Sequence, residues 1–467
     1  MKKSTIIFVI ICLIVNSSCE DYVEIDTPNF QIVNENVFSD ESTALAAMQG
    51  IYNELSPSFF TGAASTHMGM SGNLIEPRIA SLKYDPYYQH DINTLDGVDA
   101  TDNLRVWSSA YNMIYLTNSL IEGVKNSSVL SEDLRNSLLG QALFIRAWTY
   151  FYLTNFYGDV PLLLSTDYEI NATAPRVSAE EVWLQIESDL DEAIALLQTD
   201  IIYPEEQRFY VTQNVAFAFK ARVCLYREDW SKAEEYSSKI IAQSSDYEML
   251  DDLEKVFLRN SKEAIWQIDP IGSTPRIVTA EGLAYVIRTF LFGLVQGEIV
   301  LSQDFVNDFS GNDKRLMYWV GTYQKSSDIY PYINKYKEYV SNSNNSESSV
   351  VLRLAEQYLI RSEARLRQNK LDMAIKDIDV IRHRAGIDLI VDTNPEITSE
   401  ALLDTIMEER KKELFGEYGH HWLDLKRTKN VLEEFVDNPS WQDTDIWYPI
   451  PEQERLKNPN LGQNEGY

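Results

Sequence analysis

Cysteine is scarce in this sequence, which has three in 467 residues. Cys12 lies in an N-terminal apolar run that we expect to be removed, and Cys19 is the expected first residue of the mature chain. Cys224 is then the only other cysteine, so no internal disulfide is expected. The fold must therefore rest on burial of apolar side chains, which a chain of this length can supply. Cys224 itself lies in an apolar helical segment and is expected to be an inert core residue.

Basic residues are also few, with 41 Lys and Arg against 71 Asp and Glu, for a formal net charge of -30. A surface of this charge repels phosphate backbones and anionic headgroups. Nucleic acid is therefore not expected as a partner. Neutral ligands such as sugars are unaffected by this charge.

Long apolar runs are missing beyond the N-terminus, where no stretch approaches the about 18 residues of a membrane-spanning helix. Lys2 and Lys3 precede an apolar run at 6–15 that is too short to span a bilayer, which is typical of an export signal. Small or polar residues then lead to Cys19 and resemble a bacterial lipobox, with Asn16 in place of the usual branched apolar residue. The resemblance implies a signal peptide at 1–18 and lipid anchoring through Cys19. Residues 19–38 would form an extended, lipidated tether.

Motifs of common catalytic and metal sites are absent: the sequence has no Gly-rich phosphate loop, nucleophile elbow or zinc signature. His420 and His421 are adjacent, and with His383 they suggest a metal site. Neighbouring residues on a helix point about 100° apart, whereas helical ligand pairs use i, i+4 spacing. A metal site is therefore not expected.

Acidic residues at 408, 409, 413 and 417 have a spacing that could present paired carboxylates for acid/base catalysis. Arg410, Lys411 and Lys412 lie among them, which favours a salt-bridged helix instead. Arg146, Arg361 and Arg382 occur amid apolar residues and are expected to form partly buried pairs with acidic neighbours.

Helical periodicity begins at 40–55, with Ser39 as a possible N-cap, and a second helix is predicted over 104–124. The segment 134–157 is apolar or aromatic around most of its circumference, which predicts a central helix that ends at Gly158. Ser178 and Glu181 form a capping box that opens the next helix, up to 197.

An internal repeat relates 222–240 to 363–381, each with a helix end, a polar turn and a second helix that starts around an alanine. The matched positions are Trp230 with Leu371, Ala233 with Ala374, and Ile240 with Ile381. This pattern is typical of tetratricopeptide-like units, in which alanine permits close approach of the two helices. We expect a mostly α fold with helix pairs at about 134–197, 211–243 and 353–386 and a few short strands.

The segments 56–100 and 265–350 are rich in Gly, Ser, Asn, Tyr and Pro and predict long ligand-facing loops. A glycan site needs flat aromatic rings for stacking and polar groups for hydrogen bonds to hydroxyls. Two aromatic clusters, at 83–91 and 317–324, fit this requirement. The predicted ligand-binding residues are Asn73, Arg78, Tyr84, Asp85, Tyr87, Tyr88, Trp319 and Tyr323.

Five segments, in order along the chain, resemble the SusD/RagB family of nutrient-binding outer-membrane lipoproteins. They are FIRAWTYFYLTNFYGDVPLL (144–163), APRVSAEEVWLQIESDLDEAIALL (174–197), 353–387, ERKKELFGEYGHHWLDLKR (409–427) and WYPIPEQERLKNPNLGQNEGY (447–467). The resemblance extends over the whole chain. His421 departs from the pattern, because the family more often has arginine there.

This resemblance implies a single SusD-like domain at 39–467, displayed on the outer face of the outer membrane by acylated Cys19. Its function would be to bind an oligosaccharide or another polymeric nutrient and deliver it to a partner SusC-like TonB-dependent transporter. The helices would face the transporter barrel and the loops the ligand. No cofactor or catalytic residue is implied; calcium occurs in some family members but is assigned to no residue here.

Two other functions remain open at this point. One is a surface scaffold or assembly protein whose helical repeats bind no small ligand. The other is a surface hydrolase, for which the sequence offers no positive signal.

Overall fold

The structure is a computed structural model that describes residues 37–79, 85–88, 101–198, 208–259, 261–270, 278–289, 295–339 and 346–467. The predicted lipid anchor Cys19 and the predicted ligand contact Tyr84 lie outside these residues. Within the described ranges, every helix is too short or too polar to cross a membrane.

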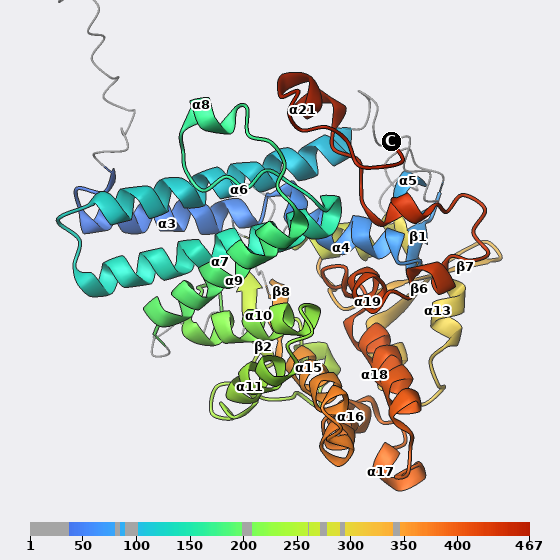
Figure 1. The fold of residues 1–467 in the computed structure, drawn as a ribbon. Coiled ribbons are helices and arrows are strands. Elements are labelled where there is room, and N and C mark those ends of the chain that lie inside the picture. Colours follow the sequence, from blue (N-terminus) through green and yellow to red (C-terminus); the bar gives the residue numbers. More distant parts are fainter. Residues whose placement is uncertain are drawn as a thin grey trace, which may run out of the picture.

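Four long helices form the upper layer of the molecule (Figure 1). They are α3 (Glu41–Leu55), α6 (Thr101–Asn126), α7 (Glu132–Tyr157) and α9 (Ala179–Leu196). Helix α7 packs against both α6 and α9, and all its residues from Leu138 to Tyr157 are buried. The apolar circumference seen in the sequence therefore does belong to a central helix. Gly158 ends it at a φ of 72°, a conformation that favours glycine.

Of the two helix starts predicted from capping residues, the structure confirms one and corrects the other. The capping box is present at α9, where the amide of Glu181 donates to Ser178 and the amide of Ser178 donates to Glu181. At α3 the N-cap is Asp40 rather than the predicted Ser39, because the Asp40 carboxylate accepts hydrogen bonds from the amides of Ser42 and Thr43.

Two helix pairs occupy the segments that share the internal repeat. Helices α10 (Gln213–Tyr226) and α11 (Trp230–Ile241) form the first, and α15 (Leu354–Arg367) and α16 (Leu371–Ala385) the second. Helix α11 packs on α15 and so joins the pairs. Ala233 and Ala374 are fully buried, which lets the paired helices approach closely.

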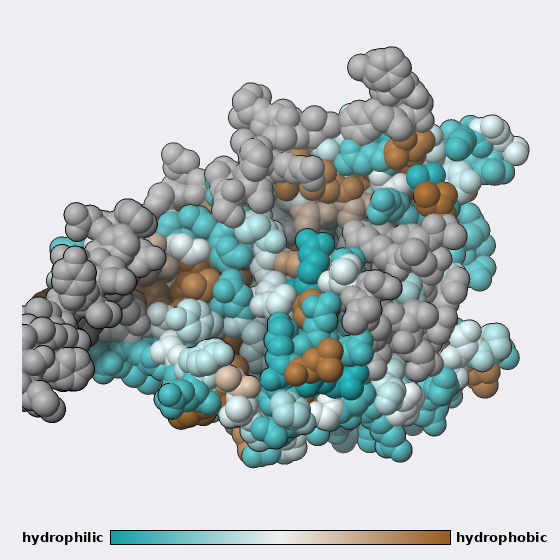
Figure 2. Space-filling view, turned by 90° about the horizontal axis from the view of Figure 1, so that it is seen from above, coloured by the Kyte–Doolittle hydropathy of each residue, from teal (hydrophilic) through white to brown (hydrophobic). Residues whose placement is uncertain are grey.

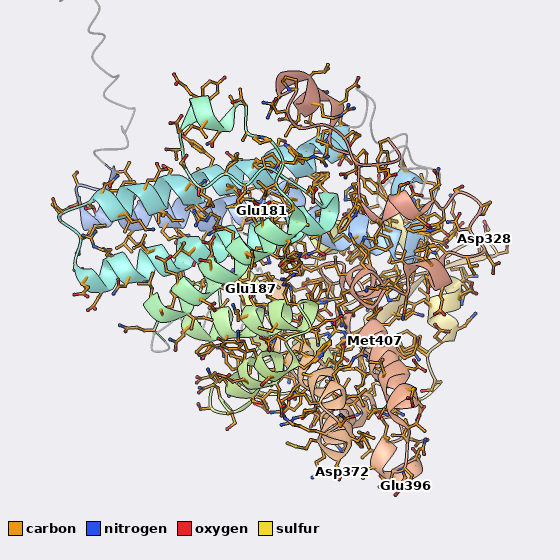
Figure 3. The ribbon with its side chains drawn as sticks, in the orientation of Figure 1. Glu181, Glu187, Asp328, Asp372, Glu396 and Met407 are labelled. Atoms are coloured by element: carbon orange, nitrogen blue, oxygen red, sulfur yellow. The ribbon has the colours of Figure 1, made fainter. Side chains whose placement is uncertain are left out.

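A second group of helices follows the repeat. Helix α17 (Ile390–Thr393) leads to α18 (Ser399–Leu414), which packs on α15 and α16, and then to α19 (His420–Thr428). Asp372 and Glu396, labelled in Figure 3, lie at the lower end of this part of the molecule. The predicted mostly helical, tetratricopeptide-like architecture is confirmed.

The described strands form four antiparallel pairs. They are β1 (Ile75–Pro77) with β5 (Ile299–Leu301), β2 (Ala264–Ile268) with β8 (Ser349–Arg353), β3 (Arg288–Thr289) with β4 (Val295–Gln296), and β6 (Val320–Lys325) with β7 (Asp328–Ile333). Strands β2 and β8 are wholly buried, so that pair is part of the core. The β6–β7 hairpin projects to the side, and Figure 3 labels Asp328 at its turn.

Helix α4 (Phe59–Ser71) lies in a segment for which the sequence predicts loops. Its sequence, FFTGAASTHMGMS, is built largely from Gly, Ala, Ser and Thr and has little apolar periodicity. Packing against α6 and α19 stabilises the helix, which local propensity alone would not. Gly69 illustrates the close fit, since a Cβ there would lie 2.7 Å from Ile75 Cδ1. The other short helices in the predicted loop segments are α5 (Asp85–Tyr88), α12 (Ala280–Tyr285), α13 (Gln303–Asn307) and α14 (Lys314–Trp319).

The C-terminal residues return to the long helices. Asn464 donates from Nδ2 to the carbonyls of Tyr157 (2.9 Å) and Tyr448 (2.8 Å), and its Oδ1 accepts a hydrogen bond of 2.6 Å from Arg176. Helix α8 (Tyr168–Asn171) and helix α21 (Glu452–Lys457) consequently lie on the same face. Seen from above, the molecule carries separate hydrophobic patches among hydrophilic residues (Figure 2).

Candidate functional site

An open groove of about 460 Å³ lies beside β1, between residues of α5, α13 and α18. Figure 1 labels these elements. We call this groove the polar groove. It is lined by Asn73, Leu74, Tyr88, Ser302, Asp304, Phe305, Asp308, Lys411, Glu434, Asn438 and Ser440. Two of the predicted ligand-binding residues, Asn73 and Tyr88, are brought together here.

The ring of Tyr88 is held in place from one end. Its hydroxyl donates a hydrogen bond of 2.8 Å to Glu76 Oε2, and the side chain is half-buried. Burial, and then the hydrogen bond to Glu76, raise the pKa of Tyr88 to about 12. The tyrosine therefore stays neutral, and its orientation is fixed by strand β1, to which Glu76 belongs.

The rest of the lining consists mainly of hydrogen-bonding groups. Asp304, Asp308 and Glu434 provide carboxyl groups, and Asn73 and Asn438 provide amides. Such groups bind hydroxyls, which both donate and accept hydrogen bonds. Among the described lining residues the one basic side chain is Lys411, which is paired with Asp308 at 3.0 Å. Burial raises the pKa of Glu434, so this carboxyl group holds its proton more readily than an exposed one.

Most of these lining residues were not predicted from the sequence. Ser302, Asp304 and Asp308 lie inside the predicted ligand-facing segment 265–350, but no aromatic cluster marks them. Asn438 and Ser440 lie far along the chain and carry no sequence signal at all. Only the tertiary structure brings these segments to Asn73.

Arg78 and Tyr323 are not among the residues that line the polar groove, and each instead contacts the β3–β4 hairpin. Arg78 Nε donates to the carbonyl of Gly297, just after β4, at 2.9 Å. The hydroxyl of Tyr323 is hydrogen-bonded at 2.8 Å to that of Thr289, the last residue of β3. The predicted residues therefore divide between the polar groove and this hairpin rather than forming one cluster.

Tyr87 and Trp319 are corrections to the predicted site, because each is only 1% exposed. Tyr87 packs edge-on against His67, with ring centroids 4.3 Å apart. The indole N–H of Trp319 donates to the carbonyl of Leu253, and the ring lies 4.5 Å from Lys335 Nζ. Both are core residues and do not reach a ligand in this structure. Asp85 begins α5, but its side chain lies outside the described part of the molecule.

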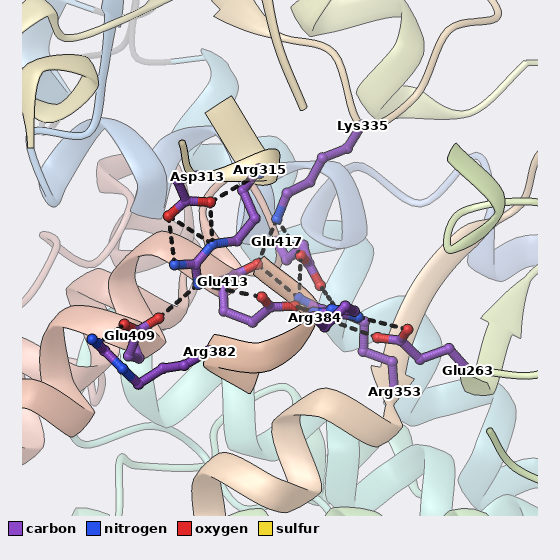
Figure 4. Close-up of polar contacts among 10 residues, drawn as sticks. All are labelled: Glu263, Asp313, Arg315, Lys335, Arg353, Arg382, Arg384, Glu409, Glu413 and Glu417. Carbon is purple, nitrogen blue, oxygen red and sulfur yellow. Dashed lines mark hydrogen bonds and ion pairs between the residues drawn. The ribbon is translucent and has the colours of Figure 1, made fainter. Parts of the chain in front are cut away.

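Glu409, Glu413 and Glu417 belong to a buried charge network, drawn in Figure 4, whereas Glu408 is 51% exposed and pairs with Lys411 and Lys412. Glu413 is fully buried; it pairs with Arg353 at 2.6 Å, with Arg315 at 3.5 Å, and with Arg384. Glu417 pairs with Arg353 and with Lys335. The complete network comprises Glu263, Asp313, Arg315, Lys335, Arg353, Arg382, Arg384, Glu409, Glu413 and Glu417.

This network confirms the prediction that the charged helix is salt-bridged. Burial alone would raise the pKa of Glu413, but Arg384, Arg353 and Arg315 together lower it far below its usual range. A carboxylate held this way does not exchange a proton near neutral pH, so it is unsuited to acid/base catalysis. The expected pairs also form elsewhere: Arg146 with Asp189, Arg361 with Asp377, and Arg382 with Glu409.

The histidines form no metal site within the described residues, where no group of three His, Cys, Asp or Glu side chains could hold a metal ion. Burial lowers the pKa of His420 well below its usual value and that of His421 to about 3. Both rings are therefore neutral parts of the packing at the start of α19. Cys224 is buried as expected, and burial raises its thiol pKa to about 12.

Two family models match the chain. Residues 307–467 match the model described as the SusD family, and residues 35–225 match one described as starch-binding associating with outer membrane. Among curated proteins, SusD-like protein P2 of Formosa agariphila is 28% identical, and SusD-like protein P25 of the same organism is 25% identical. Both matches cover 100% of this chain and 100% of the relative.

Solved structures share the fold. A laminarin binding SusD-like protein superposes with a TM-score of 0.77 at 21% identity, covering 92% of this chain and 100% of the other. A SusD superfamily protein of Bacteroides thetaiotaomicron gives 0.76 at 22% identity, covering 91% and 99%. At these identities the likeness establishes the fold alone.

Proposed function

Because this chain belongs to the SusD/RagB family, we propose that it is a non-catalytic protein that binds a glycan in the polar groove. The supporting observation is the groove itself, which is open, lined by amides, hydroxyls and carboxyl groups, and bordered by the half-buried ring of Tyr88. This combination suits a sugar, which has an apolar face and a belt of hydroxyls. The name of one matching model, starch-binding associating with outer membrane, agrees with this ligand class.

The bound glycan would be handed to a SusC-like TonB-dependent transporter. In this proposal the chain is attached to the outer membrane through acylated Cys19 and faces the cell exterior. The basis is the lipobox-like sequence before Cys19 together with the family membership. Co-purification of a TonB-dependent barrel from detergent-solubilised outer membranes, and loss of membrane retention in Cys19→Ala, would test both parts.

Isothermal titration of the protein with laminarin and with starch tests the glycan site. We expect binding of at least one polysaccharide, weakened in Tyr88→Ala and in Asn73→Gly. Glycine is the substitution of choice at 73 because Asn73 has a φ of 57°, which glycine adopts without strain. Tyr168→Ala is the matched control, since Tyr168 is 81% exposed on α8, far along the chain from the groove lining.

The titrations separate three outcomes. Loss of affinity in the two groove variants alone supports the proposed site. Equal affinity in all variants rules out the polar groove while leaving glycan binding intact. No heat with any polysaccharide in a broad panel, together with co-purification of the barrel, would favour the scaffold function instead.

A further inference from the structure

A second, smaller pocket lies at the N-terminal end of α4, facing α12. Its volume is about 190 Å³. We call it the α4 pocket. It is lined by Ser56, Pro57, Ser58, Phe59, Gly62, Ala63, Ser65, Thr66, His67, Ala280, Glu281 and Ala284. As far as the structure describes the chain, it shares no lining residue with the polar groove.

Ser58 has an unusual position in this pocket. It is the N-cap residue of α4, yet its side chain makes no capping hydrogen bond. The residue is 5% exposed, and among the described residues its Oγ has no hydrogen-bond partner. Buried hydroxyls are almost always hydrogen-bonded, so one that lines a pocket without a partner marks a place where a bound molecule can supply one.

Thr61 repeats this arrangement one turn further along the helix. Its side chain is 5% exposed, and its Oγ1 likewise has no partner within the described ranges. Thr61 does not line the α4 pocket itself. It lines an adjoining cavity of about 10 Å³, and the two share Ser56, Gly62, Ala280 and Glu281. A cavity of that size is too small for a sugar ring, so among the described residues Ser58 is the partnerless hydroxyl that a ligand of the α4 pocket meets, able both to donate and to accept.

Size and charge narrow the class of ligand. A volume of 190 Å³ corresponds to about six waters at about 30 Å³ each, which fits one ring but not an oligosaccharide. Glu281 accepts a hydrogen bond from Ser349, and burial raises its pKa, which favours the neutral form of this carboxyl group and so suits a neutral ligand. The ring of Phe59 lines the pocket and adds an apolar surface, with Arg105 lying 4.0 Å from its centroid.

We propose that the α4 pocket is a second binding site that takes one neutral, hydroxyl-rich ring, a single sugar unit. Its ligand class rests on the proposed glycan-binding function, but its location and residues do not. A hydroxyl of the sugar would pair with Ser58, and the apolar face of the ring would lie against Phe59.

Saturation-transfer NMR and titration of the full protein with free glucose, galactose and N-acetylglucosamine test the proposal. We expect saturation transfer to at least one of these sugars, and weaker binding by fivefold or more in Ser58→Ala. The variant should fold normally, because Ser58 makes no capping bond to lose. Gly62→Ala provides a second variant, since its Cβ would lie 3.7 Å from that of Ala280 and narrow the pocket.

Gly50→Ala is the matched control for Gly62→Ala. Both glycines are inside helices, but a Cβ at Gly50 would meet nothing within 4 Å. The two variants should gain helix stability alike, and only Gly62→Ala should weaken monosaccharide binding.

The two sites can fail separately. If polysaccharide binds but no monosaccharide receives saturation, or if Ser58→Ala and Gly62→Ala bind monosaccharide as the unchanged protein does, the α4 pocket is not a sugar site. If monosaccharide binds and depends on Ser58, while no polysaccharide binds, the polar groove fails and the α4 pocket stands.

Discussion

Arg353 holds both carboxylate oxygens of Glu417, donating from Nε at 2.7 Å and from Nη2 at 2.9 Å. Arg353 ends strand β8, and Glu417 follows α18, so this two-bond pair joins the core strands to the group of helices that follows the repeat. Lys335, which follows the β6–β7 hairpin, pairs with the same carboxylate. Burial lowers the pKa of Lys335 to about 8, although Glu417 acts in the opposite direction. The charge network thus fixes the segment after the β6–β7 hairpin to strand β8 and to the residues that follow α18.

Replacing Arg353 with methionine should lower the free energy of unfolding by about 3 to 5 kcal/mol, because Glu263, Glu413 and Glu417 would lose a buried cationic partner. Urea unfolding followed by circular dichroism measures this loss. Arg227→Met is the control: its partner Glu180 is 59% exposed, and such pairs contribute about 0 to 1 kcal/mol. Equal losses in the two variants would contradict the importance of the network.

Acid should destabilise the protein through Glu413. Its pKa is far lower in the folded chain than in the unfolded chain, where it is about 4.3. The unfolded state therefore binds more protons as the pH falls below that value, and the free energy of unfolding decreases with it. Above about pH 5, ionised Glu413 makes its full contribution to the free energy of unfolding. Urea unfolding at pH 7, 5, 4 and 3 should give a shallower decline in Glu413→Gln than in the unchanged protein, whereas Glu235→Gln, on the exposed face of α11, should keep the original decline.

Removing the ring of Tyr88 should weaken glycan binding more than removing its hydroxyl. Tyr88→Ala removes the stacking surface. We expect the binding free energy to weaken by about 1 kcal/mol, which raises Kd about fivefold, in addition to the effect of the lost contact area. Tyr88→Phe keeps the ring and loses the hydrogen bond to Glu76, so it should lie between Tyr88→Ala and the unchanged protein. Isothermal titration with the same polysaccharide measures Kd for both variants. Unchanged affinity in Tyr88→Ala would show that the Tyr88 ring does not contact the glycan.

Enlarging Ala374 should strain the crossing of α15 and α16. Its side chain is fully buried, and the carbonyl of this residue accepts a hydrogen bond of 2.8 Å from Ser362 on the facing helix. Ala374→Leu should lower the free energy of unfolding by about 1 to 3 kcal/mol. Ala401→Leu, at an exposed position of α18, should change it little. The midpoints of urea unfolding measure both changes. A loss of stability in Ala401→Leu as large as that in Ala374→Leu would argue against close packing where α15 and α16 cross.

Asn464→Ala should destabilise the C-terminal segment, since it leaves the carbonyls of Tyr157 and Tyr448 without this donor. A loss of about 1 to 3 kcal/mol is expected. Asn460→Ala should have a smaller effect, because Asn460 is exposed and makes one comparable bond, to the carbonyl of Thr173. Limited proteolysis gives a second readout: faster cleavage within 158–176 in Asn464→Ala than in Asn460→Ala is expected, and the reverse order would contradict this role.

Features that depend on local sequence were predictable. The apolar circumference of α7, the capping box at Ser178 and the charge pairing along α18 are each encoded in neighbouring residues. Helix α4 was not, because its small residues become helical only through packing against α6 and α19.

The candidate site was predictable only in part, because an aromatic side chain suits a ligand surface and a core equally well. Tyr87 and Trp319 are buried, while Tyr88, adjacent to Tyr87, lines the polar groove. Burial of this kind depends on which segments meet, and residues as distant as Asn73 and Asn438 meet in the groove. One sequence carries no local signal for such a meeting.

The bonds of Asn464 have a consequence for the order in which the chain folds. They join residues separated by up to 307 positions, so the carbonyl at the end of α7 gains this partner only after nearly all of the polypeptide has been synthesised. The long-helix layer can assemble earlier, because the segment after α7 also bonds to that layer, for example through Asn118 to the carbonyl of Leu163, but the contacts of Tyr157 and Arg176 with Asn464 form later. These contacts therefore form only after synthesis has reached Asn464.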